Sequence, residues 1–174
     1  PYTFANVTKP EDYKAFLAGE EKNAAHIFGA HERTVNGVKG VLFNVWAPKA
    51  LSVSVVGEFN KYDGRVHLME RIEDTGVFEL FIPGLAAGCG YMYEIKRQGK
   101  GTTRKLDPVS RQISSVPITA SVVSDENMPD SYAWNDGLWM IKRKKEAGKK
   151  KPVTVYEVSL TDWLKEKSAD ELVD

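Results

Sequence analysis

The residues with the most distinctive binding chemistry lie in one short segment, Gly57–Arg65 (GEFNKYDGR). Tyr62 lies there between an amide, Asn60, and a carboxylate, Asp63. An aromatic ring can stack on the apolar face of a sugar, while amides and carboxylates hydrogen-bond its hydroxyls. These three residues are therefore our candidate sugar-binding residues. In the alternative, the segment is a structural turn: Phe59 enters the core and the two polar side chains bond the local backbone. Tyr62 then packs against a neighbouring domain.

The remaining reactive side chains form no pattern that indicates catalysis or metal binding. The glycine-rich bend at 84–90 lies between two expected strands and not before a helix, so it is no phosphate-binding loop. The only cysteine, Cys89, excludes an internal disulfide and a thiolate zinc cluster. The three histidines, His26, His31 and His67, lack the spacing of a helical metal pair. We therefore predict that this chain contains no catalytic residue, no metal and no cofactor.

Composition narrows the class of protein. The chain has 174 residues, of which 42% are hydrophobic and 10% aromatic, enough for one domain with a core. Lysine plus arginine equals aspartate plus glutamate, 24 against 24, which argues against a nucleic-acid partner. No apolar run approaches the ~20 residues of a membrane helix. With a single cysteine, these features predict a cytoplasmic protein that handles an uncharged ligand.

Apolar periodicity predicts the elements that must position the candidate residues. Residues 4–28 follow a helical pattern that Pro10 opens and Gly19 interrupts. From residue 35 the period becomes two, which is typical of strands with one buried face. Such runs occur at 41–46, 51–55, 77–82, 91–96 and 118–123, separated by turn signals. The pattern predicts an immunoglobulin-like antiparallel β-sandwich. We expect Phe43, Trp46 and Phe81 in its core.

The C-terminal third changes character. Residues 126–152 are irregular and end in a basic run at 142–151, which we interpret as a solvated linker. We expect Trp134 and Trp139 to anchor this irregular segment and not to bind sugar. Residues 153–160 are apolar on both faces, as in a buried parallel strand, and a capping box predicts a helix from about residue 169.

A strand and a helix start cannot bury their own faces, so we interpret them as the truncated beginning of a second domain. The predicted division is an N-terminal helical segment at 1–34, the sandwich at 35–125, the linker at 126–152 and the truncated domain at 153–174.

Several segments in order along the chain resemble one enzyme family. They are FGAH (28–31), GVLFNVWAPKALSVSVVGEFNKYDGR (40–65), HLM (67–69), GVFELFIPGL (76–85), YMYEI (91–95), KLDP (105–108), PITASVV (117–123) and VYEVSLTDW (155–163). Residues 26–163 thus resemble the N-terminal part of the 1,4-α-glucan (glycogen) branching enzymes of glycoside hydrolase superfamily thirteen.

The resemblance implies a carbohydrate-binding module of family 48, followed by the first strand of a (β/α)8 barrel. The partners it implies are α-glucan and the missing barrel. The intact enzyme would cleave α-1,4-glucan and transfer the chain to a 6-hydroxyl by a retaining double displacement. Its carboxylates would lie on later barrel strands, so we expect the 174 residues alone to be inactive.

The chain departs from the family pattern at positions that bear on binding. Tyr62 stands where the family usually has Trp, and Met92 where it usually has Lys. Lys49 replaces a usual Asn and Phe78 a usual Trp. We therefore expect weak glucan binding, with packing against the barrel as the main role of the module. Two alternatives remain: a stand-alone glycogen-binding regulatory module, and the N-terminal module of a debranching-type hydrolase. The two-sided strand at 153–160 argues against the first.

Overall fold

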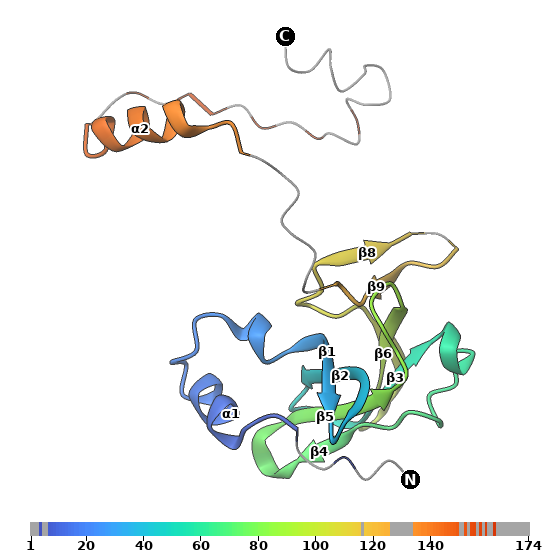
Figure 1. The fold of residues 1–174 in the computed structure, drawn as a ribbon. Helices are drawn as coiled ribbons and strands as arrows, with labels where there is room; N and C mark the ends of the chain where they lie inside the picture. Colours follow the sequence, from blue (N-terminus) through green and yellow to red (C-terminus); the bar gives the residue numbers. More distant parts are fainter. Residues whose placement is uncertain are drawn as a thin grey trace. The chain divides into compact units, whose positions relative to one another are not determined.

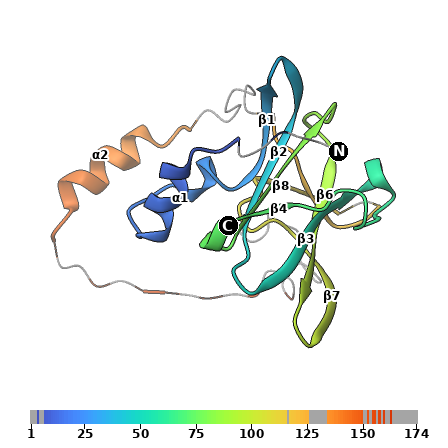
Figure 2. The same ribbon diagram turned by 90° about the horizontal axis from the view of Figure 1, so that it is seen from below.

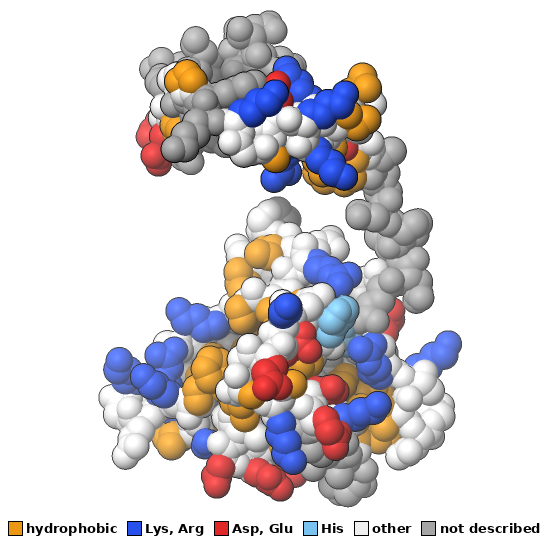
Figure 3. Space-filling view, turned by 90° about the vertical axis from the view of Figure 1, so that its left-hand side faces the viewer, with side chains coloured by type: hydrophobic (Ala, Val, Ile, Leu, Met, Phe, Trp, Pro, Cys, Tyr) orange, Lys and Arg blue, Asp and Glu red, His pale blue; other side chains and the backbone are white. Residues whose placement is uncertain are grey.

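The computed structural model describes residues 4, 7–115, 117–125 and 134–149, together with 152, 154, 155, 157, 159 and 162 (Figure 1). Its contacts divide the chain into two units, Pro1–Pro129 and Asp130–Asp174. The first unit holds the sheets, and basic and acidic side chains intermingle on the face of it that Figure 3 shows. No helix among the described residues combines the length and the apolar character that crossing a bilayer requires.

Two antiparallel sheets form the first unit (Figures 1 and 2). One has the order β1-β2-β5-β4, with β1 at Gly29–Val35, β2 at Val38–Trp46, β5 at Val77–Pro83 and β4 at Glu70–Ile72. The other has the order β3-β6-β9-β8, with β3 at Ala50–Gly57, β6 at Gly90–Arg97, β9 at Ala120–Val122 and β8 at Gln112–Ser114. In addition, β7 (Lys100–Lys105) pairs with β6. The immunoglobulin-like sandwich predicted from the sequence is confirmed.

Alternate residues of both sheets meet in the core between them. Val41, Phe43 and Val45 of β2 face Val53 and Val55 of β3, and all belong to one buried cluster. The inter-sheet contact includes an edge-on pair of aromatic rings, with the centroids of Phe43 and Tyr91 5.0 Å apart. Such pairs add stability beyond the area that they bury.

The predicted core position of Phe43 is confirmed, but that of Trp46 is wrong. Phe81 is buried as predicted, but on the outer face of the first sheet, where its ring meets that of Phe4 with the centroids 4.9 Å apart. Phe43 and Phe81 are 0% and 2% exposed, whereas Trp46 is 48% exposed. Trp46 ends β2 on the outer face of the first sheet, where its ring meets that of Phe16 in a T-shaped pair with the centroids 5.5 Å apart. Its indole N–H donates to the carbonyl oxygen of Thr75, 3.3 Å away.

An N-terminal segment covers the outer face of the first sheet. It contains α1 (Pro10–Leu17) and a 3-10 turn at Ala24–His26 (η1), a shorter helical content than predicted for 4–28. Pro10 and two acidic residues open α1 as predicted, and Gly19, at φ +74°, follows its end. Tyr13, Ile27 and Phe28 pack with Val77 of β5 in a second buried cluster.

One buried carboxylate, that of Glu79 on β5, holds this segment in place. Glu79 is 4% exposed and accepts hydrogen bonds from the backbone N–H groups of Val7 (2.6 Å) and Thr8 (3.1 Å). The Tyr13 hydroxyl also donates to it, at 2.7 Å. Burial raises the pKa of Tyr13 far above its usual value, and Glu79 raises it further, so the phenol stays a neutral donor. Beside it, the Asn44 amide donates to the Thr8 hydroxyl at 2.9 Å.

The elements whose sequences do not alternate between apolar and polar residues differ from the predictions. β1 begins at Gly29, inside the segment 1–34 that was predicted to be helical. β4, β7 and β8 were not predicted, because their residues are mostly polar and exposed. In the second unit, α2 (Gly137–Glu146) lies within the predicted linker, so Trp139 is helical and not part of an irregular stretch. The predicted strand at 153–160 and the helix from 169 fall largely or wholly outside the described residues.

We predict that Glu79→Ala lowers the free energy of unfolding by about 2–4 kcal/mol, because two part-buried backbone N–H groups and the buried Tyr13 hydroxyl lose the carboxylate that accepts their hydrogen bonds. Urea unfolding followed by tryptophan fluorescence measures this change. Glu20→Ala is the matched control, since Glu20 is exposed, and should change stability by less than about 0.5 kcal/mol. Equal stability of the two variants would contradict the role given to Glu79.

Candidate functional site

The segment that carries the candidate residues leaves β3 in a tight, left-handed turn. A 3-10 turn at Glu58–Asn60 (η2) is followed by Lys61 and Tyr62 at φ 55° and 59°. Tyr62 donates its backbone N–H to the carbonyl oxygen of Gly57 at 2.9 Å. Left-handed backbone is unfavourable for residues with a Cβ, so other contacts must stabilise this geometry.

The amide of Asn60 supplies that stabilisation. Its oxygen accepts the N–H of Gly57 at 3.0 Å, and its nitrogen donates to the carbonyl oxygen of Val55 and to Nδ1 of His67, both at 2.9 Å. Asn60 is 7% exposed, and Phe59 packs against the sandwich core. The Asn60 and Phe59 side chains therefore behave as in the alternative interpretation of the segment as a structural turn: Phe59 enters the core and Asn60 bonds the local backbone.

Burial sets the charge state of the histidine in this turn. His67 is 8% exposed, and burial lowers its pKa below the usual 6.5. The hydrogen bond from Asn60 needs an unprotonated Nδ1, which places the proton of the neutral ring on Nε2. A neutral imidazole is therefore the form that this turn accepts.

Tyr62 lies beside the β6–β7 hairpin, which projects from the sandwich in Figure 2. The guanidinium carbon of Arg104 on β7 lies 5.7 Å from the centroid of the Tyr62 ring. Arg104 also donates from Nη2 to the carbonyl oxygen of Tyr62 (2.9 Å) and from Nε to the Glu94 carboxylate (3.0 Å). Its other N–H groups have no partner within the described part of the chain. Tyr62, Glu94 and Arg104 thus form one connected group, which we call the hairpin cluster.

Asp63 points toward solvent and is paired with its neighbour Arg65. Its carboxylate accepts from the backbone N–H of Arg65 at 3.0 Å and from the guanidinium at distances down to 2.7 Å. These hydrogen bonds lower the pKa of Asp63 to about 2, so it is ionised at neutral pH. Asp63 therefore bonds the local backbone and also presents a negative charge.

The structure thus divides the three candidate residues. Asn60 is buried in the turn, whereas Tyr62 and Asp63 are partly exposed. Sequence reasoning missed Glu94 and Arg104, although a signal existed: a hairpin turn at Gln98-Gly99 places these residues opposite each other in antiparallel register. Among the described residues, no group of three or more histidine, cysteine or acidic side chains is placed to hold a metal.

Comparison with known proteins places this geometry in a family. The model of carbohydrate-binding module 48 (isoamylase N-terminal domain) matches residues 27–110, from just before β1 to just after β7. Residues 27–110 are thus similar to this family. The match includes the turn, β6 and β7, so the hairpin cluster lies within the matched region.

Curated relatives extend the similarity along most of the chain. It is 44% identical over 165 residues to the 1,4-alpha-glucan branching enzyme GlgB of Thermosynechococcus vestitus and 45% identical over 164 residues to that of Thiobacillus denitrificans. Each match covers 94% of this chain but only 21% and 22% of the relatives. The chain therefore corresponds to about a fifth of these enzymes. Among solved structures, a pullulanase of Klebsiella pneumoniae complexed with maltotriose matches with a TM-score of 0.44, 25% identity and coverage of 56% of this chain and 9% of that one.

The module's turn should respond to pH through His67. Because the folded pKa of His67 is below its unfolded value of about 6.5, acidification through this range favours the unfolded chain. We expect the stability contribution of His67 to be present above pH 6.5 and lost as the pH falls through its folded pKa. NMR titration of the ring gives this pKa, and a midpoint at or above 6.5 would contradict the assignment. His67→Gln should remove this part of the pH dependence of urea unfolding.

Proposed function

We propose that the module binds α-glucan weakly at the hairpin cluster and serves as an accessory part of a glycogen branching enzyme. The observation that carries this proposal is the position of Tyr62: a partly exposed ring beside a guanidinium with unused donors. The matched family and the named branching enzymes support the choice of ligand. They do not favour a stand-alone regulatory module or a debranching-type hydrolase.

The chemistry of the cluster suits a neutral, hydroxyl-rich chain. The Tyr62 ring offers a surface for the apolar face of a glucose unit, and the remaining N–H groups of Arg104 can donate to its hydroxyls. Asp63 supplies acceptors at the other end of the turn. Asn60 would contribute indirectly, because its hydrogen bonds hold the backbone that presents Tyr62.

Affinity is expected to be low, with a dissociation constant on the order of 1 mM for a linear malto-oligosaccharide. Tyr62 has less stacking area than the Trp that the family usually has at this position. Met92, on the same outer face of β6 as Glu94, offers no charged donor. Few groups therefore offset the cost of immobilising a flexible chain.

Chain transfer would be carried out by other parts of the enzyme. The matched relatives extend well beyond the segment that this chain covers, and their catalytic carboxylates would lie there. The 174 residues would then supply glucan contact without bond cleavage. An iodine-staining assay of the purified chain on amylose should show no branching, and branching by the chain alone would contradict this assignment.

A second role follows from the exposed residues of α2. Leu138, Trp139, Met140 and Ile141 are between 47% and 87% exposed, in an uninterrupted apolar run. Apolar runs of this kind are normally covered by a partner surface. We propose that the barrel of the longer enzyme covers them, so that α2 links the module to the catalytic part.

We predict that Tyr62→Ala weakens maltoheptaose binding about tenfold, because the stacking surface is lost. Isothermal titration calorimetry or NMR titration of the 174-residue chain measures the affinity. Trp139→Ala is the matched control, since it removes an exposed aromatic side chain outside the module. Equal affinity of the wild type and Tyr62→Ala would remove Tyr62 from the site, and loss of binding in Trp139→Ala would relocate the site to α2.

The linking role of α2 predicts a difference between the short and long proteins. The double variant Leu138→Ser, Trp139→Ser should leave the stability of the 174-residue chain within about 0.5 kcal/mol of the wild type, because these side chains are exposed in it. In the full-length enzyme the same variant should lower the melting temperature by several degrees, since buried apolar contacts are lost. An unchanged melting temperature of the full-length variant would contradict the proposed packing.

A further inference from the structure

The indole ring of Trp46 is a large apolar surface that the first unit leaves partly uncovered. Trp46 is the last residue of β2 and is 48% exposed. Its ring N–H donates to the carbonyl oxygen of Thr75 at 3.3 Å, and its ring forms a T-shaped pair with that of Phe16. The hydrogen bond uses the only polar atom of the side chain. The exposed part of the ring is therefore apolar, and the ring is held in one orientation.

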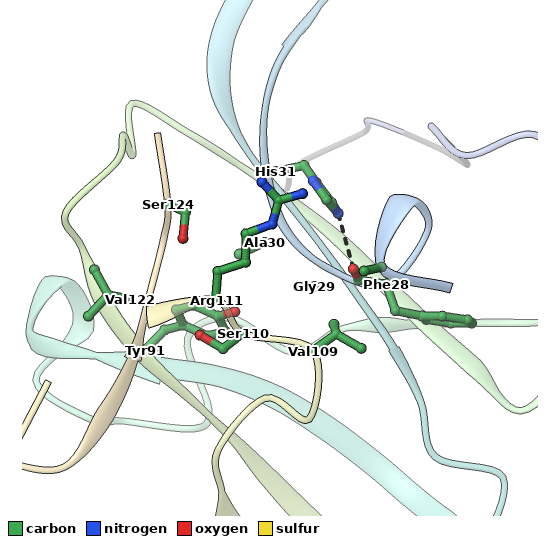
Figure 4. Close-up of a pocket in the computed structure, with 11 residues that line it drawn as sticks. Phe28, Gly29, Ala30, His31, Tyr91, Val109, Ser110, Arg111, Val122 and Ser124 are labelled. Atoms are coloured by element: carbon green, nitrogen blue, oxygen red, sulfur yellow. Dashed lines mark hydrogen bonds between the residues drawn. The ribbon is translucent and has the colours of Figure 1, made fainter. Parts of the chain in front are cut away.

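Two further rings connect Trp46 to the interior of the first unit. The ring centroids of Phe16 and Phe28 lie 4.6 Å apart, and Phe28 is 5% exposed. The backbone of Phe28 is fixed as well, because its carbonyl oxygen accepts a hydrogen bond from Nε2 of His31 at 3.1 Å (Figure 4). Trp46, Phe16 and Phe28 thus form a row of rings that runs from the surface into the second buried cluster.

Two turns that carry charged side chains flank the ring of Trp46. One connects β2 to β3, and in it Ala47 donates its N–H to the carbonyl oxygen of Gly76 at 2.8 Å. The other is the 3-10 turn η3 (Glu73–Thr75), which supplies the carbonyl oxygen that holds the indole. Three charged residues of these turns are exposed, namely Lys49, Glu73 and Asp74.

The backbone of the two turns is closely packed and strained. Gly76 has a φ of +76°, and a Cβ there would lie only 2.8 Å from Cα of Pro48, so a side chain at this position would displace the other turn. Glu73 has a φ of 41°, which is unfavourable for a residue with a Cβ. The turn of the hairpin cluster has the same feature at Lys61 and Tyr62. Strained backbone therefore occurs beside both of these aromatic rings, and such strain is concentrated at binding sites.

We propose that Trp46 forms a second α-glucan contact of the module, in which one glucose unit stacks on the exposed part of the indole. The choice of ligand rests on the proposed function. An indole has a larger face than the phenol of Tyr62, and charged side chains around a single ring suit a ligand that combines an apolar face with hydroxyls. A protein partner would instead favour apolar surroundings, because the centres of protein interfaces are depleted of lysine, aspartate and glutamate.

The second contact is too far from Tyr62 to hold the same glucose unit. A tight turn, in which Ala50 donates its N–H to Ala47, joins Trp46 to the start of β3. Tyr62 donates its N–H to Gly57 at the end of β3. A strand of this length spans about 25 Å, so the two rings contact different glucose units. A long or branched glucan can occupy both contacts at once, which raises its overall affinity above that of either contact alone.

NMR titration of the 174-residue chain with maltoheptaose tests the proposal, because each contact has its own signals. We expect saturable shifts of the Trp46 indole N–H and of the Thr75 and Gly76 amides. Trp46→Ala should weaken binding read at these two amides at least about tenfold, and Trp46→Phe, which keeps an aromatic ring, should retain part of the affinity. Leu17→Ala is the matched control, since Leu17 is an apolar residue of α1 with 47% exposure, and should bind like the wild type.

The outcomes separate this contact from the hairpin cluster. Unmoved signals of Trp46, Thr75 and Gly76, at concentrations that shift the amides of Lys61 and Tyr62, would overturn the second contact and leave the proposed function in place. Shifts at Trp46 without shifts at Tyr62 would support the second contact and remove the hairpin cluster from the glucan site. Equal affinities of Trp46→Ala and Leu17→Ala, read at Thr75 and Gly76, would also overturn the proposal.

Discussion

Burial of the first sheet on both faces is the constraint on which the module depends. Where the sheet is covered by the second sheet and by the N-terminal segment, water cannot satisfy its polar groups, so each buried polar group needs a partner inside the protein. Glu79 and Asn44 meet this need by bonding residues 7–13, which makes the N-terminal segment part of the same cooperative structure. Asp107 does the same at the other side of the sandwich, where two tyrosine hydroxyls and a backbone N–H bind one carboxylate. Each carboxylate connects segments far apart in the sequence.

As a result, packing and the glucan binding proposed for the hairpin cluster use different surfaces of the first unit. The outer face of the first sheet is used for packing, whereas the turn after β3 and the hairpin of β6 and β7 remain accessible. Within the hairpin cluster, Glu94 and Arg104 therefore lie on paired strands, whereas Tyr62 lies on a turn. Arg104 joins the two parts, since it bonds the Tyr62 carbonyl oxygen and the Glu94 carboxylate at once. The proposed binding surface is therefore formed in the absence of ligand, which would limit the entropy lost on association.

The sequence was sufficient for the strands whose apolar residues alternate, such as Val41, Phe43 and Val45. It was not sufficient for β1 and β7, because polar residues that pair by backbone hydrogen bonds leave no apolar pattern. Trp46 was misplaced because a large apolar side chain at a strand end was assumed to be covered. At the candidate site, the residue type alone indicated Tyr62. An asparagine amide can bond either a ligand or the local backbone, and only the three hydrogen bonds of Asn60 show that it bonds the turn. Arg104 could be placed beside Tyr62 only once the register of the β6–β7 hairpin was known, and residue types and their spacing did not determine that register.

The Asn60 amide has a consequence for how this surface can change over evolutionary time. The left-handed turn is held by the buried Asn60 side chain, which is not part of the proposed binding surface. The Tyr62 hydroxyl makes no hydrogen bond among the described residues. Shape and recognition are therefore encoded by different residues. Position 62 is free to exchange one aromatic for another, and so to retune affinity, without refolding the loop that displays it.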